Sequence, residues 1–316
     1  MDAYSLRRQD STETLASLIQ LDPSPIDSEP DLPGMVDEAL ARKGYRTSTY
    51  SSLGLSGSGV TRIQRYSSYT FSVFAGLHLA NTSIIPLIYR SVPYSEPFLV
   101  MAREIYQTPL AEPLLIGLPV LAHVASGIAL RLVRRKQNLR RYGNAAAHQL
   151  VETRGQSRSW AWPPLSNISA SGYLFLGLLT AHVAINRAVP LLVEGDSSNV
   201  GLQYVAHGFA RVAPYLQVQA WPSYAALVYF AAGHMVWGWA KWFGVAPMPL
   251  ASWQEEHALA PHVRRRRRRA WWAVQGSAVA VAALWAAGGL GVVAKAGRAG
   301  GWLGSVYDGM YGFAWQ

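Results

Sequence analysis

The chain has 316 residues, of which 50% are hydrophobic and only 15% are charged, with 12 Trp and 16 Tyr. This composition argues against the pair of soluble domains that a chain of this length could otherwise form. The absence of cysteine excludes disulfides, thiolate metal ligands and covalently attached c-type haem.

Residues 1–60 are rich in Ser, Pro, Asp and Glu and are expected to form a disordered cytosolic tail. They lack the patterns of a secretory signal and of a cleaved mitochondrial presequence. The stretch LIQLDPSPID places three aliphatic side chains before two prolines spaced by one residue. These candidate partner-binding residues are Leu18, Ile19, Leu21, Pro23 and Pro25. Such a segment is extended and can dock in a groove at low entropic cost, although an ordinary Pro/Ser-rich tail has the same pattern.

Five apolar stretches then follow, each long enough to cross a bilayer, which requires about 20 helical residues. They lie near residues 68–89, 113–133, 171–193, 222–243 and 271–294. Aromatic residues cluster at their ends, as is typical of membrane interfaces. The sequence therefore predicts an all-α membrane protein with five transmembrane helices in residues 61–295 and a short C-terminal tail at residues 296–316.

Most of the net charge of +10 lies in two connections between these spans. One is the segment between the second and third spans, and the other contains the unbroken run Arg264 to Arg269. With five spans, both lie on the side of the N-terminus, which the positive-inside rule makes cytosolic. The arginine run also resembles a nucleic-acid or nuclear-localisation patch. Between two spans it is expected instead to contact anionic lipid headgroups, so no nucleic-acid partner is predicted.

Four of the spans carry one histidine each: His78, His123, His182 and His234. The stretches AGLHLANTSIIPLI and LTAHVAINRAVPLL share Ala, Pro and Leu at two, eight and nine places after the histidine. AHVASGIAL and GHMVWGWAK share Gly and Ala at four and six places after it. The core is therefore a duplicated two-helix unit, with offsets of 104 (182 − 78) and 111 (234 − 123) residues.

Intramembrane histidines are costly to leave unpaired and are functional candidates by default. A glycine four residues after a histidine lies on the same helical face and leaves space for a flat ring such as haem. Alternatively, it only lets two helices approach closely. The duplication predicts that His123 faces His234 and that His78 faces His182. Because each histidine lies about 8–12 residues from its span ends, all four are expected near one level, where two haems would be crowded.

The stretches HVASGIALR and HMVWGWAKW resemble the haem-ligand helix of succinate dehydrogenase and fumarate reductase membrane anchors, His-x-x-x-Gly followed by a basic residue. This resemblance implies that His123 and His234 are axial ligands of a b-type haem. On the pattern of the five-span anchors with two haems, it implies that His78 and His182 hold a second. No other metal is expected.

The tail, the duplicated histidine unit and the basic loops together resemble the fungal mitochondrial outer-membrane MCP family, whose members complement the loss of ER–mitochondria tether components. The distinctive stretches are GLHLANTSIIPL, HVASGIALR and TAHVAINRAVPL. The resemblance implies a multi-pass mitochondrial outer-membrane protein that acts in lipid homeostasis at membrane contact sites. It also implies that Leu18, Ile19, Leu21, Pro23 and Pro25 recruit a chorein-type bridge lipid-transfer protein.

Two hypotheses of function follow. The first is a receptor for that lipid-transfer protein, whose core is also a candidate for scrambling membrane lipids along polar groups at mid-depth (His78, Asn81, Thr82, His182, Asn186 and Arg187). The second is a b-type cytochrome that passes electrons, with a quinone as a candidate partner. No phosphate loop, nucleophile elbow or paired-carboxylate site is recognisable, so the chain is not expected to be an enzyme unless it is such a cytochrome.

Overall fold

The computed structural model describes residues 57–150, 162–163, 165–211, 214–247 and 259–314. The N-terminal tail with its Pro-x-Pro segment lies outside these residues. Within the described ranges all regular structure is helical, without a strand, which confirms the expected all-α class.

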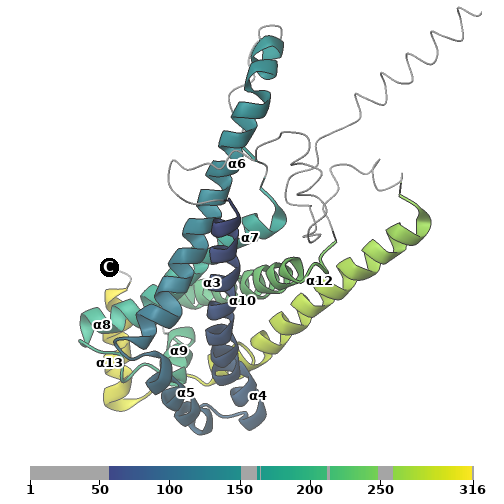
Figure 1. Cartoon of the computed structure of the whole chain (residues 1–316). Helices are drawn as coiled ribbons and strands as arrows, with labels where there is room; N and C mark the ends of the chain where they lie inside the picture. Colours follow the sequence, from purple (N-terminus) through teal and green to yellow (C-terminus); the bar gives the residue numbers. More distant parts are fainter. Residues whose placement is uncertain (1–56, 151–161, 164, 212–213, 248–258, 315–316) are drawn as a thin grey trace, which may run out of the picture. The chain divides into compact units, whose positions relative to one another are not determined.

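The apolar stretches of the sequence form the long helices of Figure 1. The first comprises α3 (Gly57–Leu79), η2 (Ala80–Ile84) and α4 (Ile85–Tyr89). The second comprises η3 (Pro113–Gly117) and α6 (Leu118–Leu150), and the third comprises α7 (Asn167–Val183), η5 (Ala184–Ala188) and α8 (Val189–Val193). The others are α10 (Pro214–Trp242) and α12 (Pro261–Gly289). Shorter elements connect them, namely α5 (Val92–Tyr106), α9 (Leu202–Phe209), η6 (Val293–Lys295) and α13 (Gly301–Phe313).

Four helical stretches of the described chain are long and apolar enough to cross a membrane: Ser58–Tyr89, Pro113–Leu139, Asn167–Val193 and Pro261–Lys295. They coincide with four of the five expected spans. The remaining expected span lies within α10, which is not among the four, because its many Trp, Tyr and Gly residues make it less apolar. The arginine run lies within α12, which begins at Pro261, and α6 continues through the described part of the first basic segment to Leu150.

Local sequence signals explain where several helices begin and end. The Ser166 hydroxyl accepts a hydrogen bond from the backbone N–H of Ser169 (3.2 Å) and caps the start of α7. Arg90 ends α4 in the left-handed conformation (φ 52°), so the chain turns sharply before α5. Gly244 adopts a positive φ of 69° just after α10, as is usual for a glycine that follows a helix.

The prolines eight residues after His78 and His182 explain the two wide turns η2 and η5. Proline has no N–H to donate and its ring clashes with the carbonyl four residues earlier, so the α-helical bonding pattern fails there. A five-residue π-helical turn precedes the proline in both copies. In the first copy Thr82 Oγ1 donates to the carbonyl of His78 (2.6 Å). In the second, Asn186 Nδ2 donates to the carbonyl of His182 (2.8 Å), so the donor groups of both side chains bond to their own helix.

Close backbone approach joins the first and last spans. α3 packs along α6, and α10 packs along α7 and α12. Where α12 crosses η2, Ser83 Oγ donates to the carbonyl of Trp285 (2.9 Å). Gly288 lies directly against the backbone of Ser83, where a Cβ atom has no room. Small residues at this crossing therefore allow helix contact without a hydrophobic driving force.

The short helices α5, α9 and α13 and the turn η6 gather at one end of the long helices, next to α4 and α8, and we call this group the end cap (Figure 1). Its core contains Tyr204, Tyr307, Met310 and Tyr311, all buried. The rings of Tyr204 and Tyr311 are stacked, with centroids 4.6 Å apart. The segment expected as a short C-terminal tail therefore contains a helix packed into this core.

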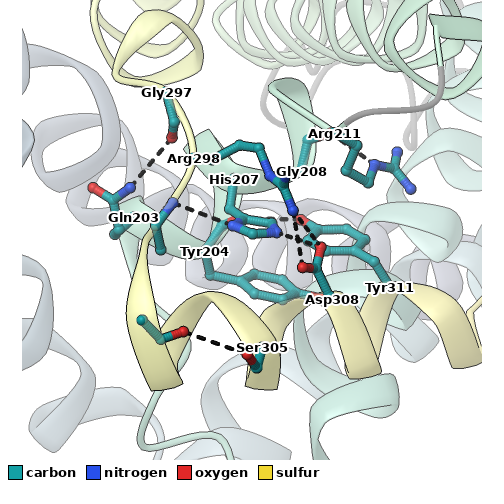
Figure 2. A network of polar contacts seen from close by, with 12 residues as sticks. Gln203, Tyr204, His207, Gly208, Arg211, Gly297, Arg298, Ser305, Asp308 and Tyr311 are labelled. Carbon is teal, nitrogen blue, oxygen red and sulfur yellow. Dashed lines mark hydrogen bonds and ion pairs between the residues drawn. The ribbon is translucent and has the colours of Figure 1, made fainter.

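A fully buried histidine links α9 to the C-terminal helix (Figure 2). His207 Nδ1 accepts a hydrogen bond from the backbone N–H of Ala299 (3.2 Å), so its Nε2 carries the proton and donates to Asp308 Oδ1 (2.9 Å). Arg298 donates to both oxygens of the same carboxylate (3.1 and 2.9 Å). Tyr311 also donates from its hydroxyl to the carbonyl of Tyr204 (3.2 Å).

A second set of bonds fixes α5 against the start of α9. The Glu96 carboxylate accepts from the backbone N–H groups of Leu202 (2.9 Å) and Gln203 (3.3 Å), the first donors of α9. A carboxylate at a helix N-terminus also interacts favourably with the helix dipole. Burial nevertheless raises the pKa of Glu96, against the lowering effect of these two bonds. Arg103 donates to the carbonyls of Ser197 and Val200 in the preceding loop.

Acid is expected to loosen α13 from the cap. Burial alone would raise the pKa of Asp308, but the hydrogen bond from His207 and the guanidinium of Arg298 outweigh it and lower the pKa. A lowered folded-state pKa contributes stability above the ordinary carboxyl pKa and loses it as the pH falls through the folded value. Hydrogen exchange of residues 301–313, corrected for intrinsic rates, should therefore accelerate below about pH 4. Asp308→Asn should already exchange rapidly at neutral pH, whereas Ser305→Ala should behave as wild type. Wild-type exchange that stays constant across this range would contradict the expectation.

Candidate functional site

The four intramembrane histidines form two facing pairs. The ring centroids of His78 on α3 and His182 on α7 are 6.0 Å apart, with an interplanar angle of 77°. Those of His123 on α6 and His234 on α10 are also 6.0 Å apart, at 85°. The expected pairing across the duplicated unit is confirmed. The helices that carry each pair make little backbone contact, so the rings meet between them.

Backbone carbonyls orient the His123–His234 pair. His123 Nδ1 lies 3.1 Å from the carbonyl oxygen of Gln64, and His234 Nδ1 lies 3.0 Å from that of Ile168. A carbonyl only accepts, so each Nδ1 carries the proton and each Nε2 keeps its lone pair. A metal-ligating histidine is usually oriented in this way. These two partners were not predicted from the sequence, although their separation of 104 residues (168 − 64) repeats the offset of the duplication.

The two pairs lie at different depths along the bundle, so the expectation that all four histidines share one level is wrong. His78 follows Gln64 by 14 residues (78 − 64) on α3, and His182 follows Ile168 by the same number (182 − 168) on α7. At 1.5 Å per residue this separation is about 21 Å. The reason lies in α5, whose last residue Tyr106 contacts Phe74 on α3 (ring centroids 5.1 Å apart). The second span therefore begins beside the middle of the first span, Ser58–Tyr89, rather than at its end.

Polar side chains, rather than carbonyls, surround the His78–His182 pair. Asn186 Nδ2 lies 3.4 Å from His182 Nδ1 and donates to the hydroxyl of Tyr224 (3.1 Å). The Tyr224 ring stands edge-on to His182, with centroids 5.6 Å apart. The Nδ1 atom of His78 is buried without a hydrogen-bond partner among the described residues. The rings of this pair are thus less firmly oriented than those of His123 and His234.

Glycines shape the space around the His123–His234 pair. A Cβ at Gly172 on α7 would lie 2.6 Å from His234 Cε1, so this glycine makes room for the ring. A Cβ at Gly127 would lie 3.2 Å from Gln64 Nε2, so that glycine serves the approach of α3. Gly238 has no neighbouring atom within 4 Å of its Cβ position. Of the two glycines that follow the histidines, only Gly238 leaves open space as expected.

The pairs fit the axial positions of a b-type haem. A metal–imidazole bond of about 2 Å on either side of an iron atom places the two ring centroids about 6 Å apart. Both pairs show this spacing. The Nδ1-protonated tautomer of His123 and His234 leaves Nε2, the ligating nitrogen, available. Whether a haem is bound stays a prediction.

Arg187 and Asn81, two further polar residues of the apolar helices, have partners within the protein. Arg187 forms an ion pair with Glu112, which directly precedes η3, and also donates to the Ser197 hydroxyl. Asn81 Nδ2 donates to the carbonyl of Leu77 (2.8 Å). An intramembrane charge is tolerated when it is paired in this way. These groups, which the sequence offered as a path for lipid headgroups, are thus engaged with neighbouring protein groups.

The fold and the paired histidines define a multi-pass helical membrane protein built from a duplicated two-helix unit. The chain belongs to the family of the MDM10-complementing protein 1 transmembrane domain, whose model matches residues 73–175 and 177–298. The two matched segments, of 103 (175 − 73 + 1) and 122 (298 − 177 + 1) residues, each contain two of the four histidines. Comparisons with curated proteins and with solved structures gave no match. Membership indicates a mitochondrial membrane protein, while the resemblance to succinate dehydrogenase anchors stays a prediction.

Replacing Gly172 should displace His234 and destabilise the bundle. The Cβ of Gly172→Ala would overlap the imidazole, and such overpacking costs about 1–3 kcal/mol. Gly177→Ala on the same helix is the matched control, because no atom lies within 4 Å of its Cβ position. There the substitution should be neutral or stabilise the helix by up to about 1 kcal/mol. Thermal unfolding of both variants in detergent tests this, and equal shifts for the two would contradict it.

Proposed function

We propose that the chain is a mitochondrial outer-membrane receptor for a chorein-type bridge lipid-transfer protein and supports mitochondrial lipid homeostasis at membrane contact sites. The observation that carries the proposal is membership of the MDM10-complementing protein 1 family over two segments that include most of the helical core. The tail supplies a docking element of a suitable type, LIQLDPSPID. In this proposal the core anchors the receptor and the tail binds the partner.

The receptor role requires a cytosolic tail, which a five-span topology provides. We assign α10 as the fifth span, because its 29 residues measure about 43 Å and it packs between two candidate spans, α7 and α12. Its only Asp, Glu, Lys or Arg residue is Lys241, in the last turn. With five spans the arginine run at the start of α12 lies on the side of the N-terminus. The positive-inside rule makes that side cytosolic.

The tail segment is suited to weak but specific docking. The fixed φ of Pro23 and Pro25 means that little backbone freedom is lost when the segment binds in extended form. Leu21 or Ile19 then provides an apolar anchor beside the prolines. The affinity of so short a contact is modest, and attachment of both partners to membranes raises their effective concentration.

Replacement of both motif prolines should abolish recruitment without affecting the core. Pro23→Ala with Pro25→Ala restores backbone freedom and removes the two ring contacts, so we expect at least a tenfold loss of lipid-transfer protein on mitochondria. The matched control is Pro30→Ala with Pro33→Ala, in the same tail outside the motif. Recruitment is measured by co-purification and by the mitochondrial fraction of the partner, with membrane insertion of the variant verified. Normal recruitment by the double motif variant would remove the docking role from this segment.

Lipid scrambling by the core stays a prediction of the sequence. A bridge protein delivers lipid to one leaflet, so an acceptor membrane needs a way to relieve the imbalance. Along the expected headgroup path, however, Asn81, Thr82 and Asn186 donate hydrogen bonds to carbonyls of their own helix, and Arg187 is paired with Glu112. The proposal of a receptor does not depend on this activity.

A second candidate function, a b-type haem protein, is favoured by the spacing of the histidine pairs. His123 and His234 would hold one haem and His78 and His182 a second, about 21 Å away along the helices. A bound haem would supply reversible one-electron transfer, with a quinone as a candidate electron partner. The carbonyls of Gln64 and Ile168 fix the tautomer of the first pair. Two imidazoles in direct edge-to-face contact would have the same centroid distance of 6.0 Å. The distance alone therefore does not separate a haem site from a haem-free polar core, whereas the absorbance of haem does.

The visible spectrum of the purified full-length chain tests this candidate. After expression with sufficient haem supply, we expect a reduced b-type band and up to two haems per chain. His123→Ala or His234→Ala should lose one haem while His78→Ala or His182→Ala loses the other. His262→Ala, at the exposed start of α12, serves as the control. A colourless wild-type protein would eliminate the haem candidate and leave the receptor proposal intact.

A further inference from the structure

Two exposed cationic side chains next to the end cap line one cavity. Arg90 follows α4, and Lys295 is the last residue of η6. Together with Leu87, Val92 and Val292 they line a cavity of about 600 Å³ between the α4–α5 corner and the end of α12. None of the residues that line it is acidic.

These two bases differ from the other arginines at this end of the described chain, all of which are engaged by protein groups. Arg103 donates to loop carbonyls, Arg187 pairs with Glu112, Arg211 donates to the Gly208 carbonyl and Arg298 pairs with Asp308. For the side chains of Arg90 and Lys295, by contrast, the described residues provide no hydrogen bond or ion pair. Two like charges that share a cavity without a counter-charge favour the binding of an anion.

The first turn of α5 also borders this cavity. Arg90 ends α4 in the left-handed conformation (φ 52°), which turns the chain into α5. Ser91 precedes the first residue of α5, Val92, and provides no side-chain cap. The positive end of the α5 dipole therefore borders the same cavity and adds to its positive potential.

The position of the cavity indicates the kind of anion. Arg90 directly follows the candidate span Ser58–Tyr89, and Lys295 ends the candidate span Pro261–Lys295. Both therefore lie where apolar helix gives way to the headgroup region of a bilayer. Leu87 and Val292 give the cavity an apolar wall, and the neighbouring Ile88 is exposed. A phosphate with attached acyl chains matches both parts of this surface.

We propose that this cavity binds an anionic phospholipid, with the phosphate between Arg90 and Lys295 and an acyl chain against Leu87 and Val292. In the proposed topology the site faces the leaflet opposite the arginine run of α12. The proposal concerns a resident lipid of the core and is independent of partner docking by the tail. Failure of either proposal therefore leaves the other in place.

The test uses the purified full-length chain in uncharged detergent, with phosphatidylglycerol as probe and phosphatidylcholine as reference, and bound lipid measured by native mass spectrometry. Each base near a membrane contributes about 1 kcal/mol, so Arg90→Gln with Lys295→Gln should weaken phosphatidylglycerol binding about 30-fold. The control Lys241→Gln removes a base in the last turn of α10, outside the cavity lining, and this variant should bind as wild type. Arg90→Lys with Lys295→Arg keeps both charges and should retain binding within about threefold.

Two further measurements distinguish a lipid site from a site for free phosphate and from a loss of folding. Thermal unfolding of the variant Arg90→Gln with Lys295→Gln, measured without lipid, should match wild type. If that variant does not fold, the single variant Lys295→Gln replaces it, and we expect its binding to be about fivefold weaker than that of wild type. Inorganic phosphate at millimolar concentration should neither bind measurably nor displace phosphatidylglycerol. Undiminished lipid binding by the folded Gln variants would overturn the proposal. Equal displacement by phosphate would also overturn it, because the site would then recognise the free ion rather than a lipid.

Discussion

The structure depends on one constraint: a polar group inside an apolar bundle needs a partner within the protein, because the surrounding lipid offers none. The histidines meet this need largely through one another, although the Nδ1 atom of His78 has no hydrogen-bond partner among the described residues. Each imidazole lies on a separate helix and faces one from the other half of the duplication, at the same 6.0 Å in both pairs. Polar side chains beside them bond back to carbonyls of their own helix, and Arg187 in η5 has an acidic partner, Glu112, directly before η3.

Duplication turns this local solution into an arrangement on two levels. The same 14-residue separation between carbonyl partner and second histidine occurs in α3 and in α7, so the two pairs are stacked along the helices rather than crowded together. The copies have nevertheless diverged: carbonyls orient His123 and His234, whereas Asn186 and Tyr224 surround His182. The two histidine pairs, about 21 Å apart along the helices, therefore differ in what holds their rings.

The sequence predicted what depends on local pattern. Composition and length located the long helices, and the repeat offset predicted which histidines face each other. The relative depth of the helices was missed, because it depends on α5 running back along the bundle until Tyr106 reaches Phe74. The end cap was also missed, because its helices are short and its bonds join distant residues, such as His207 with Asp308, 101 positions apart. The helices α6 and α12 also extend beyond the expected spans into basic sequence, to Leu150 and from Pro261. The ends of an apolar stretch therefore predicted the ends of its helix poorly.

The two ends of the bundle differ in whether their basic side chains have acidic or carbonyl partners. Near the start of α12, six arginines follow one another with no acidic residue between them. The positive-inside rule associates such a basic segment with the cytosolic side. At the opposite end, by contrast, Arg187 and Arg298 are paired with acids, and Arg103 donates to backbone carbonyls. In the proposed topology this end passes through the bilayer during insertion, and internal compensation helps because unpaired charges oppose translocation. Arg90 and Lys295 are exceptions within the described chain, because neither has an acidic or carbonyl partner there. Both line one cavity at the ends of two spans. In our proposal the phosphate of a bound lipid supplies their counter-charge.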